Sequence, residues 1–113
     1  MGNRFGIPED VMKDITGRDR NCAYCSKSLT YPYDPANRND SATIEHLDFD
    51  GPFYWGDSLK PENIVMACGS CNSSRGVKRL SKWLESEYCA NKRITSDTVS
   101  DTVKQYLVRN PLK

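Results

Sequence analysis

The chain has 113 residues, a formal net charge of +1 and a mean hydropathy of −0.70. This length suits one domain, residues 1–113, and is short for two. No apolar run approaches the roughly 20 residues that cross a bilayer, and the first ten residues lack the apolar core of a secretion signal. We therefore expect an intracellular, cytoplasmic protein with no membrane partner.

The first predicted element is a helix over residues 8–16. Pro8 suits its first turn, Gly17 suits its end, and Val11, Met12 and Ile15 form a short apolar stripe between them. The helix leads into the first of two cysteine pairs. Residues 31–41 are rich in turn-forming residues and are predicted to be a loop.

The two cysteine pairs predict a metal site. Each pair has the spacing Cys-x2-Cys, and together they supply four sulfurs, Cys22, Cys25, Cys68 and Cys71. Four thiolates are the tetrahedral set that structural zinc prefers, and they leave no open position for a water molecule. We therefore expect Zn²⁺ that holds the fold. Disulfides are the alternative, although nothing indicates an oxidising compartment. Cys89 stands alone and is expected to be a free thiol.

The remaining elements complete an α+β pattern. Residues 42–47 and 64–67 are predicted to be two short strands, joined by the long loop 48–63, which suggests a functional loop. An apolar helical period predicts a helix over about 79–90. A last helix over about 96–109, capped by Thr95 or Ser96, completes the chain.

The chain has a single histidine, His46, directly after Glu45. A neutral imidazole can take a proton from water near pH 7, which makes His46 a candidate general base. A lone histidine beside apolar residues is more often structural, so the residue alone does not decide the matter.

Four segments in a fixed order change this balance. They are Cys22-x2-Cys25, Ile44-Glu45-His46-Leu47, Pro61-Glu62-Asn63-Ile64-Val65 and Ala67-Cys68-x2-Cys71-Asn72-Ser73-Ser74-Arg75-Gly76. Together they resemble the HNH endonucleases, from about Cys22 to Arg79. The resemblance implies a ββα-metal core, also called a His-Me finger, over about residues 20–79, with two zinc knuckles and flanking helices.

The resemblance also implies a role for each matching residue. His46 takes the place of the general base, and Asn63 that of the asparagine that braces the loop between the strands. Glu45 and Asn72 take the places of ligands to a catalytic cation. Asn72 departs from the histidine that many members carry there, and its amide oxygen favours Mg²⁺ or Mn²⁺. Asp48 or Asp50 could join this site, but we expect both on a solvated loop.

The expected reaction is phosphodiester hydrolysis in DNA, with RNA not excluded. Basic residues that could follow a phosphate backbone are Arg75, Lys78, Arg79 and Lys82. One active site cuts one strand at a time, so a homodimer is a conceivable assembly. A non-catalytic zinc-stapled nucleic-acid-binding module is the alternative, and a small interaction domain that ignores nucleic acid is a third reading.

Overall fold

A two-stranded antiparallel hairpin forms the centre of the computed structural model, which describes residues 3–111. Strand β1 spans Ala42–His46 and pairs with β2, Ile64–Cys68, in a register that sets Ala42 opposite Cys68 and His46 opposite Ile64. All five residues of β2 are buried, whereas β1 has two buried residues, Ala42 and Glu45, and three half-buried ones. The hairpin therefore has a covered strand and a strand with an accessible face.

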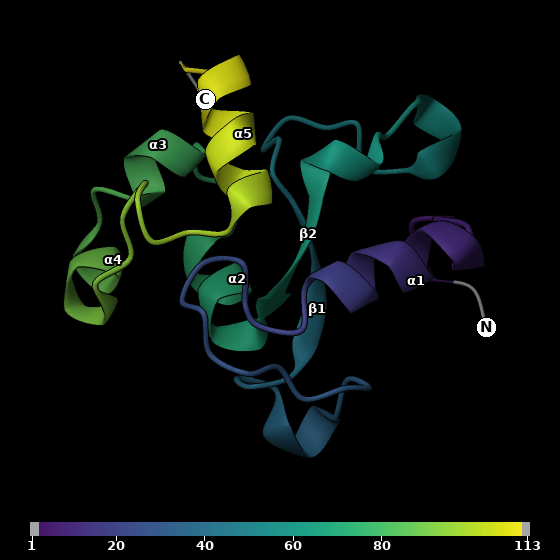
Figure 1. Cartoon of the computed structure of the whole chain (residues 1–113), viewed down its shortest axis with the longest axis horizontal. Coiled ribbons are helices and arrows are strands. Elements are labelled where there is room, and N and C mark those ends of the chain that lie inside the picture. Colours follow the sequence, from purple (N-terminus) through teal and green to yellow (C-terminus); the bar gives the residue numbers. More distant parts are fainter. Residues whose placement is uncertain (1–2, 112–113) are drawn as a thin grey trace.

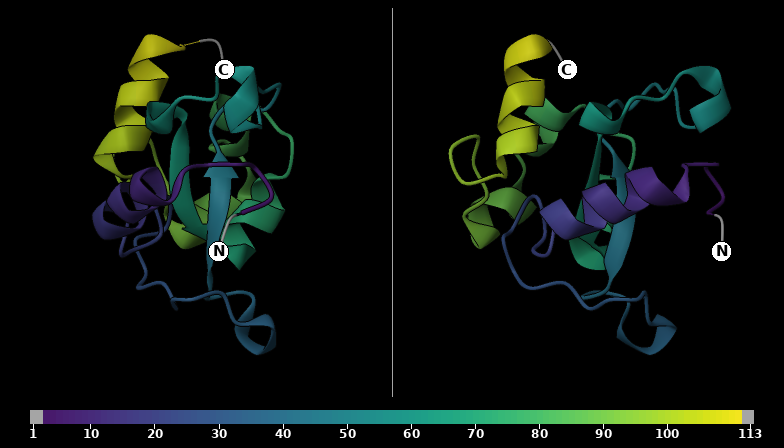
Figure 2. Two further views of the ribbon diagram at one scale, coloured as in Figure 1. Left: turned by 90° about the vertical axis from the view of Figure 1, so that its right-hand side faces the viewer. Right: turned by 45° about the vertical axis from the view of Figure 1, so that its right-hand side comes forward.

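Two helices enclose the hairpin. Helix α1, Glu9–Arg18, contacts β2, while α2, Gly69–Arg75, contacts both strands. The hairpin lies between them, as Figures 1 and 2 show. Acidic residues in the first turn of α1 and a basic residue in its last turn match the helix dipole, and Ile15 is its buried contact. The predicted first helix is confirmed, with its end two residues later than expected.

The C-terminal part differs from the prediction in its helix boundaries. In place of one helix over 79–90 there are α3, Leu80–Trp83, and α4, Glu87–Lys92, because the Ser86 side chain accepts from the Cys89 N–H and starts a new helix. The last helix, α5, spans Asp101–Arg109 and is capped by Ser100 in the same way. Thr95 and Thr98 instead form a local turn before it.

Three short 3-10 segments punctuate the loops. They are η1, Pro35–Asn37, η2, Trp55–Asp57, and η3, Pro61–Asn63. The loop that contains η1 packs tightly on the start of α2, where a Cβ at Gly69 would lie 2.0 Å from the Arg38 carbonyl oxygen. Glycine is therefore required at position 69 by a close approach of two backbones.

The described residues form a compact α+β structure. Their radius of gyration is 13.2 Å, close to the roughly 13 Å expected for a folded chain of about 100 residues. The largest buried side chains of the core include Trp83, Tyr24, Tyr106 and Ile15. The outermost residues of the predicted domain, 1–2 and 112–113, lie outside the described part of the chain.

Candidate metal centre and active site

The four paired cysteines meet at one end of the hairpin. Their sulfur atoms all lie within 4.8 Å of one another, and the Cys25 and Cys68 sulfurs are 3.9 Å apart. A tetrahedral zinc ion with Zn–S bonds of about 2.3 Å separates its sulfurs by about 3.8 Å. The observed spacing therefore fits a zinc ion, and the predicted zinc-binding cluster is confirmed as a cluster of four sulfurs.

Neighbouring donors also suit thiolates in this cluster. The backbone N–H of Cys68 donates to the Cys22 sulfur at 3.3 Å, and the Cys71 N–H donates to the Cys68 sulfur at 3.4 Å. The Tyr88 hydroxyl donates to the Cys71 sulfur at 3.3 Å. Such outer contacts orient ligands and support their negative charge.

The sulfurs also perturb one another. Hydrogen bonding to Cys22 lowers the pKa of Cys25 and of Cys68, while hydrogen bonding within the cluster raises the pKa of Cys22 and of Cys71. A bound divalent cation would hold all four as thiolates. Cys89 is buried and free, and it does not belong to the cluster.

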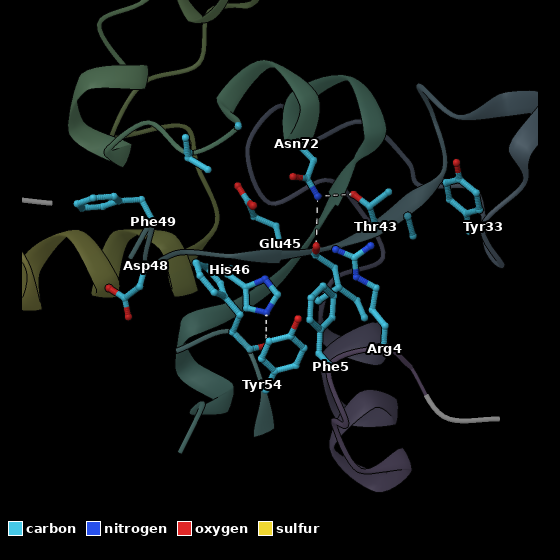
Figure 3. A pocket seen from close by; sticks show the side chains of 15 residues that line it. Arg4, Phe5, Tyr33, Thr43, Glu45, His46, Asp48, Phe49, Tyr54 and Asn72 are labelled. Carbon is cyan, nitrogen blue, oxygen red and sulfur yellow. Dashed lines mark hydrogen bonds between the residues drawn. The ribbon is translucent and has the colours of Figure 1, made fainter. Parts of the chain in front are cut away.

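A pocket of about 820 Å³ lies along β1 and continues to the opposite end of the hairpin (Figure 3). Its lining includes three residues that the sequence singled out, Glu45, His46 and Asn72. Glu45 and His46 leave β1 on opposite sides in Figure 3, as neighbours on a strand do. Both nevertheless line the pocket, since β1 ends at His46.

His46 is held in one orientation. Its Nε2 lies 2.9 Å from the Phe53 carbonyl oxygen, and since a carbonyl only accepts, Nε2 carries the proton and Nδ1 has the free lone pair. The ring packs edge-on against Phe5 at 4.4 Å and Phe53 at 5.4 Å between centroids. Burial, together with the positive charges of Arg4 and Arg75, lowers its pKa, which favours the neutral form.

Asn72 is oriented by its amide nitrogen. This nitrogen donates to the Thr43 hydroxyl at 3.0 Å and to the Ile44 carbonyl at 3.2 Å. The amide oxygen is thereby turned away from these acceptors and toward the side of Glu45 in Figure 3. A fixed amide oxygen that faces a pocket is a suitable ligand atom for a hard cation.

Glu45 is buried and already has two partners. The Tyr24 hydroxyl donates to its Oε2 at 2.7 Å, and an Arg75 guanidinium nitrogen lies 3.4 Å from the same oxygen. Burial raises the pKa of Glu45, while the positive charge of Arg75 opposes that rise. The carboxylate thus lies in the pocket beside a positive charge that partly neutralises it.

Arg75 has an internal position. Only 1% of it is exposed, and its guanidinium donates to the backbone carbonyls of His46 at 2.8 Å, Leu47 at 2.7 Å and Lys78 at 2.8 Å. These contacts tie the end of β1 to α2. The expectation that Arg75 follows a phosphate backbone therefore needs correction, because its donors are turned inward.

Asn63 and Asp48 form a second polar network at this end. The Asn63 amide donates to one Asp48 carboxylate oxygen at 3.1 Å, and the Tyr106 hydroxyl of α5 donates to the other at 2.6 Å. Asn63 thus contacts the loop between the strands. Asp48 is 9% exposed and lines the pocket, so its expected place on a solvated loop was wrong. Asp50 is exposed, as expected.

The remaining basic residues lie outside the pocket lining. Lys78, Arg79 and Lys82 are all exposed. Lys78 donates to the Ser74 carbonyl, and the Arg79 guanidinium lies 5.4 Å from the ring centroid of Phe49. Because Phe49 lines the pocket, Arg79 places a positive charge next to the Phe49 end of the pocket.

Two tyrosines at this site went unnoticed in the sequence. Tyr24 lies inside the first cysteine pair and reaches Glu45, and Tyr106 reaches Asp48 from a helix outside the four matching segments. The apolar period of the last helix predicts Tyr106 as a core residue, but no local pattern identifies its partner, 58 positions away in the chain.

Comparisons with protein-family models, with curated proteins and with solved structures found no match for this chain. Among the described residues, no helix has the length and apolar character needed to cross a membrane.

Proposed function

We propose that this protein is a divalent-metal-dependent endonuclease that hydrolyses phosphodiester bonds in DNA, built on an HNH-type ββα-metal core. The proposal extends the sequence resemblance to the arrangement of β1, β2 and α2. It assigns His46 as the general base, Asn63 as the residue that braces the loop, and Glu45 and Asn72 as the ligands of Mg²⁺ or Mn²⁺.

One observation carries the proposal. The Phe53 carbonyl holds the His46 proton on Nε2, so Nδ1 is the basic nitrogen. In the same pocket lie the fixed amide oxygen of Asn72 and the carboxylate of Glu45. A neutral base and two oxygen donors in one pocket are the combination that metal-assisted hydrolysis requires.

Each residue then has a defined task. His46 Nδ1 would take the proton from the attacking water. Glu45 and Asn72 would hold the cation, and Asp48 is a further carboxylate in the lining of the pocket. The bound cation would neutralise charge on the phosphate and on the leaving oxygen. Lys78, Arg79 and Lys82 would contact phosphates beyond the site.

One observation favours the alternative, a zinc-stapled module that binds nucleic acid without cutting it. Arg75 lies 3.4 Å from Glu45, and a positive charge there competes with a divalent cation for the same carboxylate. The alternative predicts DNA binding with no cleavage in any divalent metal.

Plasmid cleavage tests the proposal. Supercoiled plasmid is incubated with the protein and Mg²⁺ or Mn²⁺, and nicked and linear products are measured over time. Loss of a general base costs about 10² to 10⁴-fold in rate, so His46→Ala should fall by this factor. Val108→Ala, an exposed position on α5 away from the pocket, should cleave as the parent does. Equal rates for His46→Ala and the parent would exclude the mechanism.

A further inference from the structure

Exposed apolar side chains gather at one place on the molecule. Five large hydrophobic side chains are exposed among the described residues, and four of them, Tyr33, Phe53, Tyr54 and Val77, line the His46 pocket. The fifth, Val108, lies elsewhere. Exposed apolar side chains are ordinary when scattered, but a contiguous group commonly marks an interaction surface.

The charges of the pocket do not suit a DNA duplex. Among its described lining residues, Arg4 is the one cation, whereas Glu45 and Asp48 are two carboxylates. Duplex binding depends mainly on several Lys or Arg contacts to phosphates. Stacking on aromatic rings, in contrast, binds bases whose faces are free. The lining is therefore richer in groups that bind bases than in groups that bind a backbone.

Two exposed tyrosines lie at separate places along the pocket. Tyr33 is 48% exposed and Tyr54 is 51% exposed. In Figure 3, Tyr54 lies beside His46, and Tyr33 lies farther along β1, beyond Thr43. Tyr33, Thr43 and Asn72 also line a smaller adjoining hollow that includes Arg38. The groove thus continues past the amide of Asn72 toward a second exposed cation.

We infer that the pocket takes a single strand of DNA, with unpaired bases stacked on Tyr33 and Tyr54 and the backbone between them passing His46. Arg4 and Arg38 contact the flanking phosphates. This inference rests on the proposed nuclease function, since it names the form of DNA that the same site accepts. It places the specificity of the site in the loops 31–41 and 48–63, outside the strands and α2.

Binding measured without cleavage tests the inference. The zinc-loaded protein is titrated into three fluorescein-labelled probes with no other divalent cation added, and anisotropy is recorded. The probes are a 16-nucleotide single strand, the duplex of the same sequence, and a single strand of equal length with abasic positions at its centre. We expect the single strand to bind at least about tenfold more tightly than either other probe, as a base stack is worth about one power of ten or more.

Matched variants locate the effect. Tyr33→Ala and Tyr54→Ala should each weaken single-strand binding about tenfold, whereas Tyr54→Phe keeps the ring and should bind as the parent does. Val108→Ala removes an equally exposed apolar side chain outside the pocket and should change nothing. All three positions are exposed, and thermal unfolding checks that the variants are folded.

Several results would overturn the inference. One is that the duplex or the abasic strand binds the parent protein as tightly as the intact single strand. Another is that Tyr33→Ala and Tyr54→Ala bind the single strand as tightly as the parent does. A third is that the parent binds no DNA at all. A parent protein that binds the single strand as described but cleaves neither that strand nor plasmid in Mg²⁺ or Mn²⁺ would instead contradict the nuclease proposal. The two failures are therefore distinguishable.

Discussion

The two ends of the central hairpin differ in the chemistry of their side chains, in burial and in accessibility to a ligand. At the Ala42–Cys68 end, four sulfurs are packed into a closed cluster, and three of them belong to fully buried or nearly buried residues. Along β1 and toward the His46–Ile64 end, an amide, two carboxylates and an imidazole line an open pocket. One end can hold the fold together, and the other is accessible to a ligand.

Helix α2 connects these ends. It begins directly after Cys68, carries Cys71 and Asn72 in sequence, and ends at Arg75, which holds the carbonyls of His46 and Leu47. A helix whose start is fixed by the cysteine cluster can position an amide and a guanidinium against a neighbouring strand. The comparison predicts that substitutions at the cysteine end affect stability and zinc binding, and that substitutions at the His46 end affect cleavage.

Zinc removal should have the largest effect. Structural zinc contributes about 10–16 kcal/mol of apparent binding free energy, which equals or exceeds the roughly 5–15 kcal/mol stability of a typical domain. Chelation should therefore unfold the protein, as followed by circular dichroism, and added Zn²⁺ should restore it. Cys71→Ser should lose zinc, whereas Cys89→Ser, at a buried thiol outside the cluster, should retain it. Cooperative unfolding that persists in chelator would contradict the assignment.

Replacement of Arg75 should give the next largest effect. Arg75→Met leaves Glu45 buried without its cation, and the loss of one partner from a buried ion pair costs about 3–5 kcal/mol. The free energy of unfolding in urea measures this cost, with Lys82→Met at an exposed position as the control. Bound zinc should remain, because Arg75 does not contact a sulfur. Loss of zinc in Arg75→Met would mean that the two ends are not separable.

A matched pair of tyrosine variants gives the smallest and most specific test. Tyr106→Phe removes the 2.6 Å hydrogen bond to Asp48 and should cost about 1.5–3 kcal/mol, the usual range for a bond to a charged group. It should lower cleavage but retain zinc. Tyr88→Phe removes the hydroxyl on Cys71 and should weaken zinc affinity by about 10- to 100-fold, with cleavage unchanged in excess zinc. The reverse pattern would refute the division between the ends.

The sequence predicted the elements that depend on local patterns. Cysteine spacing gave the cluster, and the apolar runs gave both strands and the first helix close to their observed bounds. The break between α3 and α4 and the late start of α5 were missed, because Ser86 and Ser100 cap new helices that an apolar period does not reveal. Helix boundaries depend on such single side chains.

The site was predicted less completely than the fold. His46, Glu45 and Asn72 do line one pocket, since they belong to adjoining elements. The inward position of Arg75 and the burial of Asp48 depend on contacts between distant segments, 30 positions apart for Arg75 and Glu45 and 58 for Tyr106 and Asp48. From residue type alone, Arg75 was expected to contact phosphate and Asp48 to be solvated. Residue type carries no information about partners that are distant in the sequence.

The missing side chain at position 69 has a consequence for how this protein could change over evolutionary time. The Arg38 carbonyl occupies the space that a methyl group would fill, and the adjoining hollow is lined by Gly69 together with Tyr33 and Arg38. A single added carbon would overlap the backbone of this loop. Position 69 therefore has to remain glycine, and the groove can change in evolution only through the side chains of the loop that packs against it.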